Sequence, residues 1–100
     1  MDDVIFVRLT NGKVAMIDAI DASLILSDKW HAHKSAYNWY ACRMVGRRGQ
    51  RKFIYMHRVI MNVQAGRVVH HIDGNSLNNC RNNLAVCSQK ENLAYRNWGK

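Results

Sequence analysis

The N-terminal stretch carries the strongest local fold signal in this chain. Two runs rich in β-branched and apolar side chains, residues 4–9 and 13–18, are separated by Thr10-Asn11-Gly12. An Asn-Gly pair suits the tight turn between antiparallel strands, because both residues tolerate a positive φ. The sequence therefore predicts that the chain begins as a β-hairpin.

Two short helices are predicted in the first two thirds of the chain. Asp21 suits the N-cap of a helix that runs through Leu26, with one apolar stripe formed by Ala22, Ile25 and Leu26. From Met56 onward, the run MHRVIMNV predicts one or two helical turns. The side chains expected to face inward there are Met56, Val59, Ile60 and Val63.

Aromatic and basic side chains are interleaved between these two helices. Residues 29–34 and 37–45 look like two strands, and the basic turn GRRGQRK (46–52) leads into a third strand, FIYM. The first half of the chain is therefore predicted to be a small antiparallel β-meander with a short helix.

The C-terminal part predicts a strand, a loop, a second strand and a helix. Residues 67–72 and 84–87 are the two strands, and the Asn-rich turn 73–79 follows the first. The run Ser-Gln-Lys-Glu after the second strand is the capping-box pattern of a helix start. We expect this helix over residues 89–97, with Asn92 one turn inside it.

Charge is divided unevenly along the 100 residues, which suffice for one domain or for two small lobes sharing a core. Up to Asp28 there are two basic and five acidic residues, a net charge of −3. From Lys29 onward there are thirteen basic and two acidic residues, a net charge of +11. Such a cationic surface favours a polyanion as the partner, and nucleic acid in particular.

Composition argues against several other classes of protein. No run approaches the eighteen or so consecutive apolar residues of a membrane span, and the acidic start lacks the pattern of a secretory signal. We therefore expect a cytoplasmic protein without membrane contact, located in the host cytoplasm if it is phage-encoded. The cysteines Cys42, Cys80 and Cys87 are too few and too widely spaced for a disulfide framework, so they are expected to be buried thiols.

The segment VVHHIDGNSLNN (68–79) places two adjacent histidines before the Asn-rich turn. Phosphodiester hydrolysis needs a base to activate water and a divalent cation to neutralise charge on the phosphate. One imidazole can be the base, because its pKa of about 6.5 leaves it largely neutral at neutral pH. A second imidazole and a side-chain amide can hold the cation. Two neighbouring histidines and a side-chain amide can therefore supply the groups that a nuclease site needs.

The longer run VVHHIDGNSLNNCRNNLAVCSQKEN (68–92) resembles the motif of phage-type HNH endonucleases, a group similar to homing endonucleases. The resemblance implies a ββα-metal fold in which His71 is the general base and His70 and Asn92 hold a metal ion. It also implies that the amide of Asn83 ties the loop backbone so that His71 is aimed correctly. His70 departs from the family pattern, where asparagine or aspartate is common, and imidazole favours softer transition metals over magnesium.

Three upstream stretches extend the resemblance to nearly the whole chain. They are TNGKVAMIDAIDASLILSDKW, YNWYACR and FIYMHRVIM, and they are similar to the AP2-like DNA-binding region that often precedes the HNH unit. The two resemblances divide the chain into an AP2-like β-rich DNA-binding region, residues 1–55, and an HNH ββα-metal nuclease motif, residues 56–100. The expected fold class is therefore α+β.

Double-stranded DNA is the partner that these features predict. The expected phosphate contacts are basic side chains in and around the central strands: Lys34, Arg43, Arg47, Arg48, Arg51 and Lys52. In the family's His-Arg pair, Arg58 is expected to contact phosphate and His57 to pack against the motif. Trp30, Trp39 and Tyr40 are expected in the core rather than against bases.

The expected activity is endonucleolytic hydrolysis of DNA with magnesium, or with manganese, nickel or zinc in its place. A monomer would nick one strand and a homodimer could cut both. Two alternatives stay open. One is a catalytically inactive DNA-binding or regulatory module. The other is an interaction domain held by zinc through His70, His71, Cys80 and Cys87, although their spacing matches no common zinc pattern.

Overall fold

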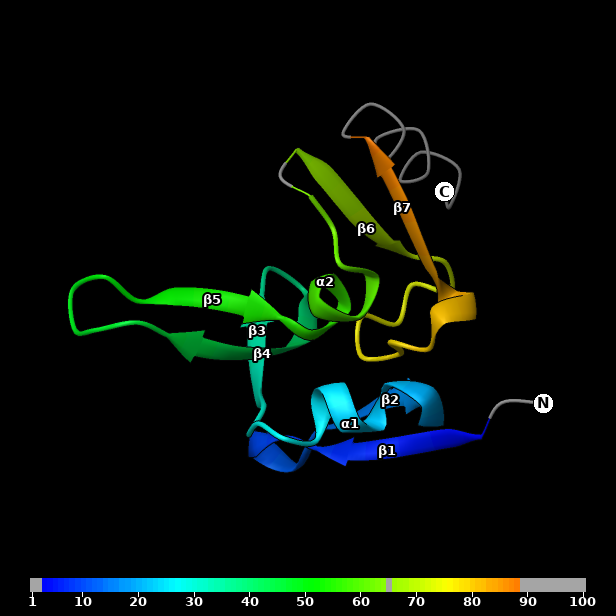
Figure 1. The fold of residues 1–100 in the computed structure, drawn as a ribbon, viewed down its shortest axis with the longest axis horizontal. Coiled ribbons are helices and arrows are strands. Elements are labelled where there is room, and N and C mark those ends of the chain that lie inside the picture. Colours follow the sequence, from blue (N-terminus) through cyan, green and yellow to red (C-terminus); the bar gives the residue numbers. More distant parts are fainter. Residues whose placement is uncertain (1–2, 65, 89–100) are drawn as a thin grey trace.

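The computed structural model describes residues 3–64 and 66–88 and has a small α+β fold (Figure 1). Three antiparallel sheets follow one another along the chain: β1 (Val4–Arg8) with β2 (Val14–Asp18); β3 (His31–Ser35), β4 (Asn38–Val45) and β5 (Lys52–Tyr55); and β6 (Arg67–His71) with β7 (Leu84–Ser88). Two short helices, α1 (Ala22–Ile25) and α2 (Met56–Met61), connect them. The expected α+β class is confirmed.

The N-terminal hairpin forms as the sequence predicts. β1 and β2 pair in register from Val4 opposite Asp18 to Arg8 opposite Val14. Asn11 and Gly12 both have positive φ, 61° and 70°, which is the backbone conformation that a tight hairpin turn needs. The Asn-Gly pair therefore accounts for the turn and for the register of the strands beside it.

α1 is shorter than expected, and Asp21 takes the predicted N-cap position but forms no side-chain capping bond. Within the described residues the Asp21 side chain does not cap the helix; its carboxylate accepts hydrogen bonds from Arg81 Nε at 3.0 Å and Nη2 at 2.7 Å. The contact with the guanidinium joins two opposite charges through two hydrogen bonds, whereas a capping bond would join the carboxylate to an uncharged N–H, which explains the preference. Ile25 is fully buried, but Leu26 is 53% exposed because the helix ends after one turn.

The middle sheet contains the predicted meander and a projecting hairpin. β4 pairs with β3 along one edge and with β5 along the other. Beyond these strands, residues 46–51 form the tip of a hairpin that extends away from the body of the molecule (Figure 1). Gly46 is required there, because it has φ 101° and a Cβ would lie 2.6 Å from the Gln50 carbonyl oxygen.

One hydrophobic core joins all three sheets and both helices. α2 contributes Met56 and Ile60 to it, and Val59 and Val63 pack against it partly buried. The remaining buried side chains of the core are Val7, Ala15, Ile17, Ile25, Trp30, Ala41, Val69 and Leu84. Residues before and after position 55 therefore share a single core.

The C-terminal strands are confirmed, with a long connection between them. β6 pairs with β7 from Arg67 opposite Ser88 to His71 opposite Leu84. Residues 72–83 form the loop that joins these two strands, and it lies between them and the N-terminal hairpin (Figure 1). The helix predicted over residues 89–97 lies outside the described residues.

The three cysteines are buried, as expected. Burial raises the pKa of the Cys42 and Cys80 thiols, and in Cys80 the nearby Asp18 carboxylate raises it further. Both thiols are therefore protonated at neutral pH. Of the helices in residues 3–64 and 66–88, none has the length and apolar character needed to cross a lipid bilayer.

Ile17 and Ile20 are close together in the sequence but differ in burial, so replacing each one tests the position of the core. Ile17 is fully buried in β2, whereas Ile20 is 77% exposed. Replacing Ile17 with alanine should lower the free energy of unfolding by about 2–5 kcal/mol, because it leaves a cavity in the shared core. The control Ile20→Ala should change it by less than about 0.5 kcal/mol. Urea unfolding of both variants measures the difference, and equal effects would contradict this packing.

Candidate active site

A cleft of about 410 Å³ opens between the β3–β4 turn and the end of β6. His70 and His71 border it from β6, and Tyr40 borders it from β4. Ser76, in the loop after β6, also lines the cleft and donates a hydrogen bond to the Trp39 carbonyl oxygen, which joins the two walls. The two adjacent histidines therefore share one concave surface.

The end of β6 explains how both histidines reach the same cleft. Burial alternates along the strand, with Val69 and His71 buried and His70 half-buried. The strand ends at His71, where the Gly74 N–H donates to the His71 carbonyl oxygen at 3.0 Å and begins a turn. Successive side chains still point to opposite faces, but at the strand end each one borders the cleft.

His71 lies in a cluster of rings. Its ring centroid is 4.9 Å from that of His57, edge to face, and 6.2 Å from that of Tyr40. Burial lowers the pKa of His71, and the neighbouring His70 lowers it further, whereas a hydrogen bond with Asn79 and the Asp73 carboxylate act in the opposite direction. The imidazole is therefore neutral at pH 7, which is the form that accepts a proton.

His57 packs behind His71, as the sequence predicts. Its side chain is only 7% exposed, and its ring also contacts those of Tyr40 and Tyr55. Burial, together with the neighbouring His71 and Arg58, lowers the pKa of His57 to about 3. His57 is therefore neutral at physiological pH and contributes packing rather than charge.

Asn83 closes the loop that follows His71. Its side-chain Nδ2 donates to Asp73 Oδ1 at 2.8 Å and to the Asn78 carbonyl oxygen at 2.9 Å, and its Oδ1 accepts from the Asp73 N–H at 2.9 Å. The expected contact between this amide and the loop backbone is therefore present. The Asn83 carbonyl oxygen also accepts from the Ile72 N–H at 2.8 Å, directly after His71.

Asp73 organises the same loop and does not act as a free carboxylate. Its oxygens accept hydrogen bonds from the Asn75 N–H at 2.8 Å and from Asn78 Nδ2 at 3.0 Å, in addition to the bond from Asn83. Burial raises the pKa of Asp73, but these hydrogen bonds outweigh it and lower the pKa overall. The carboxylate stays charged and holds the loop in shape.

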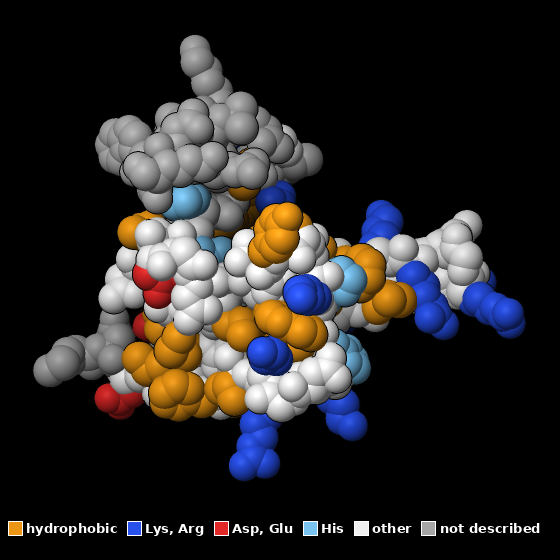
Figure 2. Space-filling view, turned by 180° about the vertical axis from the view of Figure 1, so that it is seen from behind, with side chains coloured by type: hydrophobic (Ala, Val, Ile, Leu, Met, Phe, Trp, Pro, Cys, Tyr) orange, Lys and Arg blue, Asp and Glu red, His pale blue; other side chains and the backbone are white. Residues whose placement is uncertain are grey.

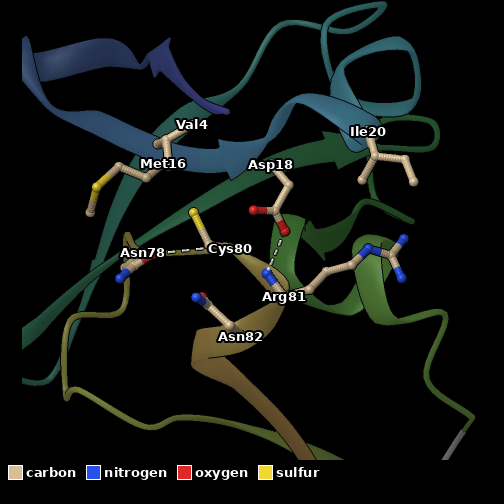
Figure 3. A pocket seen from close by; sticks show the side chains of 8 residues that line it. All are labelled: Val4, Met16, Asp18, Ile20, Asn78, Cys80, Arg81 and Asn82. Atoms are coloured by element: carbon tan, nitrogen blue, oxygen red, sulfur yellow. Dashed lines mark hydrogen bonds between the residues drawn. The ribbon is translucent and has the colours of Figure 1, made fainter. Parts of the chain in front are cut away.

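The far side of the loop rests on β2. The Met16 N–H donates to the Leu77 carbonyl oxygen, and the Asn79 N–H donates to the Met16 carbonyl oxygen, each at 2.8 Å. In Figure 3, Asp18 points from β2 toward the Arg81 N–H, which donates to its Oδ2 at 2.8 Å. Met16, Asp18 and Arg81 are among the residues that line a second cavity of about 630 Å³. The loop is therefore bound along one edge to the N-terminal hairpin.

Two of the predicted phosphate contacts have internal partners. Arg58 Nη1 donates to the Arg67 carbonyl oxygen at 2.9 Å, which ties α2 to the start of β6. Arg43 lies 3.6 Å from an Asp28 carboxylate oxygen, and its guanidinium is 5.7 Å from the Trp30 ring centroid. Neither residue borders the cleft. In the structure both side chains connect elements of the fold.

The other predicted DNA contacts are exposed and lie mainly on the projecting hairpin. Arg47, Arg48 and Arg51 are in its tip, and Lys52 begins β5. Figure 2 shows Lys and Arg side chains gathered on this projection. Lys34 lies separately, on β3. The structure therefore presents a basic hairpin apart from the cleft.

One of the two expected metal ligands lies among the described residues. His70 borders the cleft and offers an imidazole, whereas its expected co-ligand Asn92 lies outside the described residues. Among residues 3–64 and 66–88, no three His, Cys, Asp or Glu side chains come close enough together to hold a metal ion. The zinc alternative through His70, His71, Cys80 and Cys87 therefore has no support from the arrangement of these side chains.

The sequence predicted His71 and Asn83 but overlooked Asn79 and the role of β2. Asn79 Oδ1 lies 2.8 Å from His71 Nε2. The sequence signal for Asn79 was the Asn78-Asn79 pair within the motif, but by residue type such a pair indicates only a turn. No protein-family model, curated protein or solved structure matches the chain.

Acid should destabilise the fold through His57. In the unfolded chain His57 binds a proton near its ordinary pKa of 6.5, but in the fold it stays neutral down to about pH 3. Stability is therefore complete above about pH 6.5 and falls as the pH drops below it, by up to about 1.4 kcal/mol per pH unit for this one proton. Urea unfolding of the protein and of His57→Leu between pH 8 and 4 should show a shallower fall in the variant. The variant His31→Leu, at an exposed histidine, is the control. If the free energy of unfolding of His57→Leu falls with pH as steeply as that of the original protein, His57 is not the source of the acid sensitivity.

Proposed function

We propose that the protein is a metal-dependent DNA endonuclease of the HNH type, with His71 as the general base. One observation carries the proposal: a neutral imidazole at the end of β6 borders an open cleft beside His70 and precedes a loop that Asn83 closes. The AP2-like and ββα-metal assignments of residues 1–55 and 56–100 belong to the same proposal. The α+β fold and the strand-loop-strand unit of β6 and β7 support them.

His71 would remove one proton from a water molecule. As the water O–H bond breaks, the hydroxide oxygen forms a bond to phosphorus, and the bond from phosphorus to the leaving sugar oxygen breaks. The leaving oxygen takes a proton from solvent, and His71 returns its own proton to solvent, so the protein is regenerated. A base of this kind contributes about 10²–10⁴-fold to the rate.

His70 and Asn92 would hold the divalent cation. Magnesium is the expected ion, and the imidazole of His70 also suits manganese, nickel or zinc. Bound there, the ion would neutralise charge on the scissile phosphate and the leaving oxygen. His70 supports this assignment because it borders the same cleft as the base.

The charge distribution supports double-stranded DNA as the substrate. The net charge of +11 from Lys29 onward includes the exposed basic hairpin, residues 46–52, whose side chains can contact phosphates. One cleft acts on one strand at a time. A monomer would therefore nick, and a homodimer could cut both strands.

A DNA-binding module without cleavage activity is the second candidate. It is favoured by the separation between the basic hairpin and the cleft, since none of the hairpin's arginines borders the cleft in the described structure. Such a module would bind DNA equally well with or without His71. Cleavage, rather than binding, therefore distinguishes the two functions.

Replacing His71 with alanine should lower plasmid nicking by about 10²–10⁴-fold, because the reaction loses its base. Supercoiled plasmid is incubated with magnesium, manganese or nickel, and nicked and linear products are followed on a gel. DNA binding should stay within a few-fold of the original protein. The exposed His31 on β3 gives the matched control, His31→Ala, which should nick normally. Full nicking by a folded His71→Ala variant would exclude His71 as the base.

The basic hairpin should govern affinity rather than chemistry. The double variant Arg47→Ala, Arg48→Ala should bind duplex DNA more weakly, and the slope of log affinity against log salt should fall by about 1.8, because two phosphate contacts are lost. Fluorescence anisotropy across a salt series measures this slope. Arg8→Ala on β1 removes an exposed arginine outside the hairpin and should leave the slope unchanged. Equal slopes in all three proteins would remove the hairpin from the DNA interface.

A further inference from the structure

The side chain of Asn79, in the loop after β6, is fully buried and contacts the ring of His71. Its Oδ1 lies 2.8 Å from His71 Nε2. Within residues 3–64 and 66–88, its Nδ2 has no hydrogen-bond partner. A buried amide donor without a partner lowers the stability of the fold. The favourable interaction of this side chain is its contact with His71.

The chemistry of this contact determines where His71 carries its proton. A neutral imidazole has one N–H donor and one nitrogen that accepts, and a carboxamide oxygen can only accept. Because Oδ1 faces Nε2, the hydrogen must be on Nε2. Nδ1 is then the only basic atom of the ring.

Asn79 is held in place by the N-terminal hairpin. Met16 of β2 forms an isolated backbone bridge with Asn78 in the loop. The Met16 N–H donates to the Leu77 carbonyl oxygen, and the Met16 carbonyl oxygen accepts from the Asn79 N–H, each at 2.8 Å. Two residues further along, the Arg81 N–H bonds to Asp18 and the Arg81 guanidinium bonds to Asp21 (Figure 3 shows the Asp18 contact). The backbone that carries Asn79 is therefore fixed to β2 over five residues.

We propose that Asn79 is a positioning residue: it fixes the orientation and tautomer of His71, so that Nδ1 is the atom that takes the proton from water. The inference rests on the proposed function of His71. It also gives the N-terminal hairpin a second role. β2 positions the base through Asn79, in addition to any contact that the N-terminal region makes with DNA.

Three variants separate this role from simple packing. Asn79→Leu fills nearly the same space but has no acceptor; it should lower kcat for plasmid nicking by about 100-fold or more, with KM within a few-fold. Its melting temperature should stay equal or rise, because the unpartnered amide donor is removed. Asn79→Asp restores an acceptor and should recover most of kcat. Asn82→Leu, at an exposed asparagine of the same loop, is the matched control and should nick normally.

If the melting temperature of Asn79→Leu falls together with its activity, the role of Asn79 is packing alone. Failure of Asn79→Asp to recover kcat while it stays folded would exclude the acceptor role. Nicking by Asn79→Leu at the original kcat would overturn the proposal outright.

A second measurement tests the tautomer without relying on nuclease activity. The ring nitrogens of His71 are observed by ¹⁵N NMR in the metal-free, DNA-free protein at about pH 8, with His71→Ala used to assign the signals. The Nε2–H tautomer is expected in the original protein, and a loss of this preference is expected in Asn79→Leu. An Nδ1–H tautomer in the original protein would overturn the inference. If the protein nicks no DNA but the Nε2–H tautomer is observed and depends on Asn79, the proposed function fails while the positioning by Asn79 stands.

Discussion

The backbone bridge between Met16 and the loop after β6 is the constraint on which the rest of the structure depends. A twelve-residue connection between β6 and β7 has little to determine its path, since loop residues have many conformations to lose on ordering. β2 supplies that path by bonding to Leu77 and Asn79. Asn83 closes the other end against Asp73. The ring of His71 takes its position from a loop that is held at both ends.

The same arrangement explains why the histidines differ in character. His57 and His71 are buried and in contact, and burial is the main reason that the pKa of each is lowered. Of these two, His71 borders the cleft, and Asn79 is a side-chain partner of one of its ring nitrogens. A neutral imidazole that is oriented and reachable can act as a base, whereas His57 is neutral and enclosed.

The exposed basic hairpin and the cleft lie in different parts of the molecule. The exposed arginines of the projecting hairpin can attract a polyanion, while the cleft itself is lined by small polar, aromatic and histidine side chains. Arg43 and Arg58, which the sequence grouped with the DNA contacts, also have partners within the fold, the Asp28 carboxylate and the Arg67 carbonyl oxygen.

The sequence by itself determined the features that depend on near neighbours. Asn11-Gly12 set the first turn, alternating apolar residues set the strands, and the motif resemblance of residues 68–92 pointed to His71 and Asn83. Tertiary structure alone decided the partners that are distant in sequence. Asp21 bonds to Arg81 rather than to its helix, and Asn79 reaches His71 because β2 holds it there. Local patterns state which conformations are favourable, but they carry no information on which buried polar groups will meet across the core.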